Sequence, residues 1–248
     1  MNDKTVDLIY KHAVTAQKTF AQFLNQSSQA DLFKKYFHLR PTSDGITIVS
    51  TLPDAPMRGV YTKDSADLMQ KLSSIDAVLN KLVSENRKQI LDTLEELGFK
   101  RRSTKSILEE DAQATFIRGM ISNEPSYQGI QFIASELTLE QGMRFDVVGY
   151  RACDDTLYLF ELKKGRTTSA AEQVSKYCEH IRKNKSDFEK IFSSYPNLSL
   201  RTFSNIKGIA VMKFSENSSD SIWNNNAKQY GVEIWMYGSS LNFPKRYY

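Results

Sequence analysis

The sequence predicts an α/β protein in which a mixed sheet flanked by helices follows a mostly helical N-terminal region. Three observations predict this class. Helix breakers are rare over much of the first 100 residues, whereas helix and strand patterns alternate beyond them. Residues 156–163 form a short run that is apolar at odd and even positions alike, which is typical of a central strand covered on both faces.

The composition is that of a globular protein. With 248 residues, 40% of them hydrophobic and 25% charged, the chain can bury one large core or two small ones. No apolar run approaches the roughly 20 residues that span a bilayer, and charges near the N-terminus argue against a secretory signal peptide. Two cysteines exclude a disulfide scaffold and a four-cysteine zinc site, so we expect a cytoplasmic protein. Because no apolar run is long enough to span a bilayer, we expect no membrane partner. The net charge of +4 permits nucleic-acid binding without arguing for it.

The N-terminal region, residues 1–103, has mostly helical patterns. Residues 5–38 carry scattered apolar positions and few breakers, and Arg40-Pro41 ends this helical run because proline cannot continue a helix. Residues 45–61 are β-branched at the start and broken by two prolines, which indicates one strand or hairpin arm followed by a loop.

A long helix is expected over 64–97, with Asp64 or Ser65 as its N-cap and Gly98 at its end. Two heptads are few for a coiled coil, so packing within the chain is the main interpretation of its leucine seam. A homodimer through the N-terminal helical region is the alternative. The seam residues alternate by four and three positions, at Leu68, Leu72, Ile75, Leu79 and Leu82.

The basic stretch 100–106 marks the expected boundary of a second domain, residues 104–248. The order of patterns beyond it implies a mixed sheet flanked by helices. The expected helices span 107–121, 168–184, 186–194 and 218–229. The expected strands span 129–139, 143–150, 156–163, 206–214 and 231–237, with a turn through Asp154-Asp155 between the second and third.

Charged residues stand within two of these strands. Asp146 interrupts an apolar strand, and Glu161 and Lys163 lie two residues apart at the end of the covered strand, so their side chains share a face. Two buried acids on neighbouring strands need a positive charge between them, from a divalent metal or from the lysine, because an unpaired buried carboxylate is costly. Phosphodiester hydrolysis makes the same demands, since the attacking water must lose a proton and charge on the phosphate must be stabilised.

Asp146, a gap of fourteen residues and then Glu161-Leu162-Lys163 resemble the motif of the PD-(D/E)xK nuclease superfamily. The proline of the superfamily name is absent, because Arg144-Phe145 precedes Asp146. Residues 173–177 (QVSKY) resemble the Q-x-x-x-Y element on the helix after the motif strand in several branches. The resemblance implies a restriction-endonuclease-like fold for the C-terminal part of the chain.

Two further segments resemble the NucS-type endonuclease branch of this superfamily. Residues 109–113 (EEDAQ) are similar to the E-x-D-x-Q start of its first core helix, and residues 207–209 and 230–233 are similar to its C-terminal tail. The resemblance covers about 105–240. The first hundred residues do not resemble that branch's β-rich N-terminal domain, so its choice of substrate is not carried over.

The catalytic centre that the resemblance implies is small. Asp146 and Glu161 would bind the metal, with the backbone carbonyl of Leu162 as a third ligand, and Lys163 would position or activate the water. Mg²⁺ is the expected ion and Mn²⁺ the expected substitute, because Mg²⁺ keeps several waters and needs few protein ligands.

Residues on two helices complete the implied site. Glu109 would point inward from the first core helix, with Glu110 as its competitor, and Gln173 would steady the site from behind. The segment 163–190 carries eight Lys/Arg against four acids, either as a solvated helix face or as a surface for phosphates. The implied nucleic-acid contacts are Lys164, Arg166, Lys176, Tyr177, Arg182 and Lys183, of which Tyr177 would either pack or touch the DNA backbone.

Together these features predict a metal-dependent DNA endonuclease that acts in restriction, defence or DNA repair. The alternatives are a nucleic-acid-binding protein that keeps this core without its chemistry, and a nuclease that acts on RNA. The sequence has no glycine-rich phosphate loop, H-E-x-x-H pair or G-x-S-x-G elbow, so NTPase, metalloprotease and α/β-hydrolase functions lack support.

Overall fold

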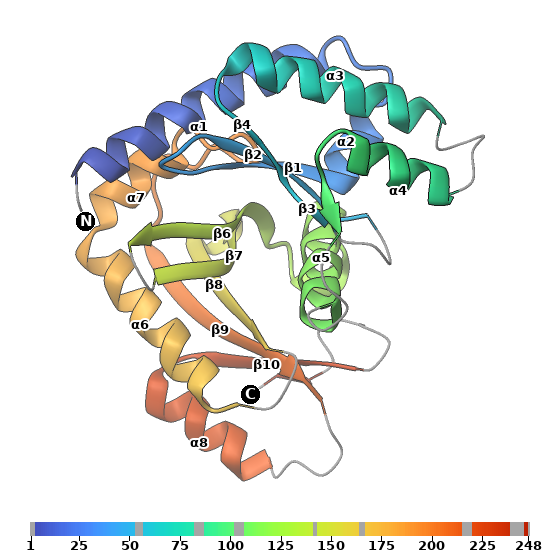
Figure 1. The fold of residues 1–248 in the computed structure, drawn as a ribbon. Helices are drawn as coiled ribbons and strands as arrows, with labels where there is room; N and C mark the ends of the chain where they lie inside the picture. The colour runs from blue at the N-terminus through green and yellow to red at the C-terminus, as the bar shows by residue number, and fades with distance from the viewer. Residues whose placement is uncertain are drawn as a thin grey trace.

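The computed structural model describes residues 3–52, 57–81, 87–101, 107–140, 143–163, 167–214, 220–238 and 246–247. It has the expected mixed α/β architecture, with a small sheet and helices before residue 102 and a larger mixed sheet after residue 106 (Figure 1). These two parts are called the N-terminal unit and the C-terminal unit below. No helix in the described ranges is long and apolar enough to cross a membrane.

The N-terminal unit is built around a cluster of phenylalanines. Phe20, Phe23, Phe33 and Phe37 contact one another with ring centroids between 4.9 and 6.4 Å apart. Four helices surround them in the described residues: α1 (Asp3–Leu24), α2 (Ala30–Tyr36), α3 (Ser65–Lys81) and α4 (Arg87–Glu96). The antiparallel sheet has the order β1 (Phe37–Pro41), β2 (Ile46–Ser50), β4 (Val60–Thr62), and the short strands β3 (Met57–Arg58) and β5 (Lys100–Arg101) pair with each other.

The expected helix over 64–97 is two helices, α3 and α4, which pack against each other (Figure 1). Asp64 is the N-cap of α3, since its Oδ1 accepts a hydrogen bond from Asp67 N–H (2.9 Å). Gly98 follows the end of α4 with a φ of 97°, a conformation that glycine adopts without strain. Both ends were therefore predicted correctly, whereas the continuity was wrong; residues 82–86 lie outside the described ranges.

The leucine seam packs inside the N-terminal unit. Leu68, Leu72, Ile75 and Leu79 are fully buried and belong to the cluster that contains the α1 phenylalanines. Leu82 lies outside the described residues. Packing within the chain is therefore confirmed for the four described positions, and these side chains are not available to a second copy of the chain.

The helical run predicted over 5–38 ends earlier than expected. Helix α2 stops at Tyr36 and β1 follows at once, with Phe37 and Leu39 facing the core of the unit. Pro41 ends β1 on the edge of the three-stranded sheet, where a missing N–H costs no ladder hydrogen bond. The helical prediction failed here because so short a strand contains too few apolar positions to establish a period of two.

The C-terminal unit contains a six-stranded sheet of order β11-β10-β9-β8-β7-β6. The strands β6, β7 and β8 run antiparallel, whereas β8, β9 and β10 are parallel. Apart from β11, which was not expected, each helix and strand lies within two residues of its predicted bounds. The strands are β6 (Gln131–Glu140), β7 (Met143–Arg151), β8 (Thr156–Lys163), β9 (Asn205–Lys213), β10 (Glu233–Tyr237) and β11 (Arg246–Tyr247), and the helices are α5 (Ile107–Ile121), α6 (Ser169–Lys183), α7 (Lys185–Phe192) and α8 (Asp220–Tyr230).

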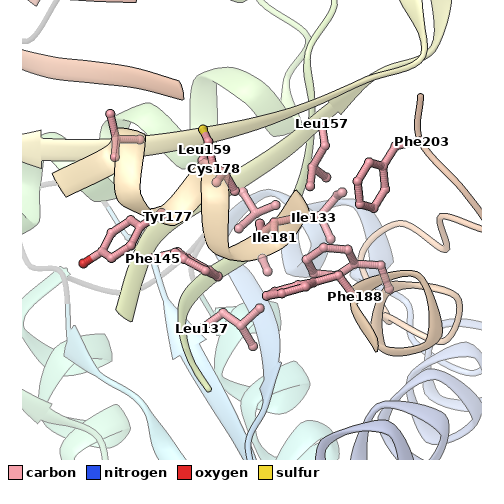
Figure 2. Close-up of a cluster of buried hydrophobic side chains, with 14 of the residues drawn as sticks. Ile133, Leu137, Phe145, Leu157, Leu159, Tyr177, Cys178, Ile181, Phe188 and Phe203 are labelled. Atoms are coloured by element: carbon pink, nitrogen blue, oxygen red, sulfur yellow. The ribbon is translucent and has the colours of Figure 1, made fainter. Parts of the chain in front are cut away.

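Strand β8 is the covered central strand that the sequence predicts. Leu157 and Leu159 face a layer formed by α6, α7 and the first half of α1, whereas Tyr158 and Phe160 face α5 on the other side. Figure 2 shows the first of these layers, with Leu157 and Leu159 near Ile181 of α6. The odd-numbered positions of β8, which include Glu161 and Lys163, therefore lie on the α6 side of the sheet.

Helix α1 belongs to both units. Val6 and Ile9 join the C-terminal core, whereas Phe20 and Phe23 join the N-terminal core. The expected domain boundary at residue 103 lies outside the described residues. Because one helix contributes to two cores, a division of the chain at that point would leave part of the C-terminal core uncovered.

Candidate active site

The candidate site lies where β7 separates from β8. The residue pairing between the two strands ends at Val147 and Phe160. One residue beyond this pair, a side chain replaces the backbone pairing: Asp146 Oδ2 accepts a hydrogen bond from Leu162 N–H (2.8 Å). Gln113 Nε2 of α5 donates to the backbone oxygen of Asp146 (2.9 Å). Asp146 is therefore fixed through its side chain and through its backbone.

A residue with a left-handed backbone lies opposite Asp146 in the register of β6 and β7. Glu136 has a φ of 50°, a conformation that is rare for a residue with a side chain. Two ion pairs hold it, with Arg40 of β1 and with Arg144 of β7. This bend in β6 connects the N-terminal unit to the strand that carries Asp146.

Glu161 is almost completely buried. Its side chain is 2% exposed, and its Oε1 lies 2.5 Å from Lys163 Nζ. The second oxygen, Oε2, is buried and has no hydrogen-bond partner among the residues that the structure describes. Burial, followed by the negative charge of Asp146, raises the pKa of Glu161 to about 7, against the opposing effect of Lys163. At neutral pH this carboxyl group therefore titrates between its protonated and charged forms.

Asp146 and Lys163 are subject to the same electrostatics. Burial raises the pKa of Asp146 and outweighs a backbone hydrogen bond and the positive charges of Lys163 and Arg144, which lower it. Burial lowers the pKa of Lys163, but the hydrogen bond to Glu161 and the charges of Glu161, Asp146 and Glu109 together raise it above its usual value. Lys163 is thus an ammonium at neutral pH, and the two acids and the amine lie close enough to perturb one another.

Glu109 and Glu110 of α5 point to different parts of the molecule. The charge of Glu109 is the smallest of the named influences on Asp146 and Glu161, and it raises the pKa of both, so its carboxylate lies within electrostatic range of the candidate site. Glu110 instead lines a small cavity beside Ser50 of β2, between the two units. Of the two neighbouring acids, Glu109 is therefore the one whose charge reaches the site, whereas Glu110 is directed toward the N-terminal unit.

Gln173 and Tyr177 lie one turn apart on α6, behind the acids. Gln173 Nε2 donates to the Tyr177 hydroxyl oxygen (2.5 Å). The Tyr177 ring packs edge-on against Phe145, with centroids 4.8 Å apart, and only 5% of the residue is exposed (Figure 2). Burial raises the pKa of Tyr177, and the charge of Glu161 adds to this effect. The ring is buried against the sheet, which is the packing role implied for Tyr177, and its contact with DNA stays a prediction.

The basic residues nearest the motif in sequence are only partly described. Lys164 and Arg166 lie outside the described residues, so the structure does not place them. Lys176 is exposed on α6 and its ammonium lies 2.6 Å from the Glu172 carboxylate, one turn earlier. This exposed pair on one helix has the geometry of a solvated helix face, where such ion pairs contribute little stability.

Arg182 and Lys183 lie far from the candidate site. Arg182 donates to the backbone oxygen of Ile206 (3.2 Å), at the start of β9, and this part of β9 pairs with the start of β8. Ile206 pairs with Leu157, six residues before Lys163, so at about 3.3 Å per residue Lys163 is about 20 Å away along the strand. Arg182 therefore lies at the opposite end of β8 from the acids, the exposed Lys183 lies next to it, and their contact with phosphates stays a prediction.

Asp146 and Glu161 present the hard oxygen donors that Mg²⁺ prefers. Within the described ranges, no group of three or more His, Cys, Asp or Glu is arranged to hold a metal ion, so an ion here would rest on two carboxylates and the Leu162 carbonyl. The buried Oε2 of Glu161 tests the fit, because a carboxylate oxygen without a donor needs a cation or a proton beside it. By this criterion the residues fit a divalent cation.

No protein-family model matches the chain, and no curated protein matches its sequence. The interpretation of the site therefore rests on its geometry and on its motif residues. Sequence reasoning missed the contributions of Gln113, Glu136 and Arg144. The EEDAQ segment drew attention to the acids rather than to Gln113, and the pairing of Glu136 with Arg144 leaves no signal in the sequence because it depends on the register of β6 and β7.

Proposed function

We propose that the chain is a metal-dependent DNA endonuclease whose C-terminal unit is a restriction-endonuclease-like core. The observation that carries the proposal is the buried carboxyl of Glu161, with one unpartnered oxygen and a raised pKa, beside Asp146 and Lys163. Acids with raised pKa values at a strand end are typical of catalytic and metal-binding sites. The element order supports the same function, since Asp146 on β7, Glu161 and Lys163 on β8, and Gln173 on α6 follow the order of the superfamily motif.

In the proposed mechanism, Asp146 and Glu161 would hold Mg²⁺ together with the backbone carbonyl of Leu162. Mg²⁺ bound there would supply the positive charge that stabilises the phosphate and lowers the pKa of a water. Lys163, as an ammonium, donates hydrogen bonds to the attacking water or to a phosphate oxygen. Of the two roles expected for this lysine, its raised pKa favours positioning over proton abstraction.

Proton transfer and alignment depend on α5 in this mechanism. Glu109 is the acid of α5 whose charge raises the pKa of both Asp146 and Glu161. We therefore assign it the role of accepting the proton that the water loses. Gln113 holds the backbone of Asp146 from the same helix. A small shift of either acid changes the position of the water, so these contacts serve alignment.

One observation favours the non-catalytic alternative. Lys163 already pairs with Glu161 in the structure, which balances the buried charge without any metal. A nucleic-acid-binding protein with such an inert core would bind DNA equally well with and without Mg²⁺. An active nuclease would exchange this internal ion pair for the metal during catalysis.

The test is incubation of the purified chain with supercoiled plasmid, duplex DNA, single-stranded DNA and RNA, each with Mg²⁺, with Mn²⁺ and with a chelator. We expect cleavage of DNA that requires the metal and is lost with the chelator. Glu109→Gln should slow cleavage, whereas Glu110→Gln should not, although the two residues are neighbours on α5. Cleavage of RNA alone would reassign the substrate, and no cleavage of any substrate with either metal would contradict the proposal.

A further inference from the structure

A cavity lies where the three hydrophobic clusters of the molecule meet. It has a volume of about 350 Å³ and is bounded by α1, α2, the end of α5, the start of β6 and the loop after α7. Its apolar wall includes one partly buried residue packed against each cluster: Leu24, Ile121 and Leu198. None of the candidate active-site residues lines it, so it is separate from the site described above.

The lining is mostly apolar in its buried part, apart from one buried histidine, His38, and polar where it is exposed. Phe37 and Phe132 are buried in the wall. The exposed lining residues are the amides of Asn123 and Gln131 and the ammonium of Lys34, which makes no ion pair within the part of the chain that the structure describes. An apolar cavity with a few polar groups at its opening is the usual form of a small-molecule site, since the wall provides burial and the polar groups fix orientation.

We propose that this cavity binds a small amphipathic anion, with an apolar body and a single carboxylate. Its apolar body would lie against Phe37 and Phe132, and its carboxylate would meet the ammonium of Lys34 at the opening. The volume equals that of roughly a dozen waters at about 30 Å³ each, so it admits a chain or ring of about ten non-hydrogen atoms. This proposal is independent of the nuclease function, because it uses none of the same residues.

The position of the cavity indicates what such a ligand would do to the protein. Leu24 belongs to the N-terminal unit, whereas Ile121 and Leu198 belong to the C-terminal unit on opposite faces of its sheet. A ligand that contacts all three binds only the arrangement in which the units are packed together. It therefore stabilises the folded chain by mass action, and the melting temperature rises with ligand concentration.

The test uses three probes that share one eight-carbon chain: octanoate, 1-octanol and octylammonium. Calorimetry and thermal melting of the full chain should show a single site for octanoate, tighter than for octanol, with octylammonium weakest. Lys34→Gln should weaken octanoate binding by up to about fivefold, the upper end for one exposed ion pair, and leave octanol binding unchanged. Lys35→Gln is the matched control, because that ammonium lies 5.3 Å from the Tyr36 ring centroid and does not line the cavity.

A second variant tests the location of the site. Leu198→Trp should fill the cavity and abolish binding of octanoate and octanol, and Ile121→Trp from the opposite wall serves if the first variant does not fold. The proposal would be overturned by octanoate binding no tighter than octanol, by equal losses in Lys34→Gln and Lys35→Gln, or by binding that survives in the folded tryptophan variant. Absence of heat and of any rise in melting temperature at millimolar octanoate would overturn it as well.

Discussion

The acids at the two ends of β8 have opposite electrostatics. At its start, the hydrogen bond from Arg151 lowers the pKa of Asp154, in the turn that the sequence predicts. At its other end, burial raises the pKa of Asp146 and of Glu161. The comparison shows that the protein stabilises the charge of one acid with its own donors and leaves the charges of the others partly uncompensated. The uncompensated end is where a cation adds most, and this difference marks the candidate site.

The largest expected effect is the difference in DNA cleavage between Asp→Asn substitutions at the two ends of β8. Asp146→Asn should reduce DNA cleavage by at least about 10³-fold, because it removes a metal ligand, and Lys163→Ala should have a similar effect through loss of transition-state charge. Asp154→Asn should leave the cleavage rate unchanged. The measurement is the initial rate of plasmid nicking with Mg²⁺. Equal losses at the two ends would remove the distinction between them.

The pH dependence of metal binding sharpens the comparison. Glu161, with a pKa of about 7, holds a proton below that pH, and a cation must displace this proton to bind. Mg²⁺ affinity should therefore rise by about tenfold per pH unit below pH 7 and level off above it. Calorimetry in buffers of different ionisation enthalpy measures the released protons. An affinity that stays constant between about pH 5.5 and pH 8 would contradict the raised pKa.

Removal of a carboxylate charge should change the stability of the metal-free protein in opposite directions at the two ends of β8. The pKa of Glu161 is raised from 4.5 to about 7 by folding, so its contribution is fully present below pH 4.5 and is lost as the pH rises through 7. Glu161→Gln should therefore stabilise the metal-free chain at pH 8, by about 1–2 kcal/mol, since Lys163 is partly exposed and can turn to water.

Asp154 provides the matched control for that measurement. Its pKa is lowered, so its contribution is present above the unfolded value of 3.8 and is lost as the pH falls through the lower folded value. Asp154→Asn should destabilise the chain at neutral pH by less than about 1 kcal/mol, because its ion pair with Arg151 is partly exposed. Urea unfolding at pH 8 measures both variants, and a change of the same sign in both would contradict the contrast.

The smallest effect concerns Glu136, the left-handed residue of β6 that lies opposite Asp146. Glu136→Gly keeps the left-handed backbone without strain but loses both ion pairs, whereas Glu136→Gln loses the charge and keeps the strain. Glu136→Gln should therefore be the less stable of the two, by about 1 kcal/mol. Thermal unfolding of the two variants decides this, and the reverse order, with Glu136→Gly the less stable, would show that the side chain matters more than the backbone strain.

The C-terminal unit could be read from the sequence because its signals are local. The alternation along β8, the apolar run of β7 and the helical pattern of α5 each define an element without reference to the rest of the chain. The cluster of Asp146, Glu161 and Lys163 followed from strand adjacency, which the short connection between the two strands makes probable in any fold.

The remaining features depend on tertiary contacts. The division of α1 between two cores, and the strand at Phe37, reflect which surfaces the chain meets after folding rather than the local pattern. The same holds for Tyr177, whose place on α6 was expected but whose packing neighbour, Phe145, was not. The position of Arg182 required the direction of α6 relative to β8, which only the packed structure gives.

The central claim is that Asp146 and Glu161 hold one divalent ion between them. Its most direct test is titration of the purified chain with Mn²⁺, followed by calorimetry and by the electron paramagnetic resonance of the bound ion. We predict a single site in the unsubstituted chain and in Asp154→Asn, and an affinity lower by more than about 100-fold in Glu161→Gln. Equal Mn²⁺ binding by Glu161→Gln and the unsubstituted chain, or no binding by the unsubstituted chain, would contradict the claim.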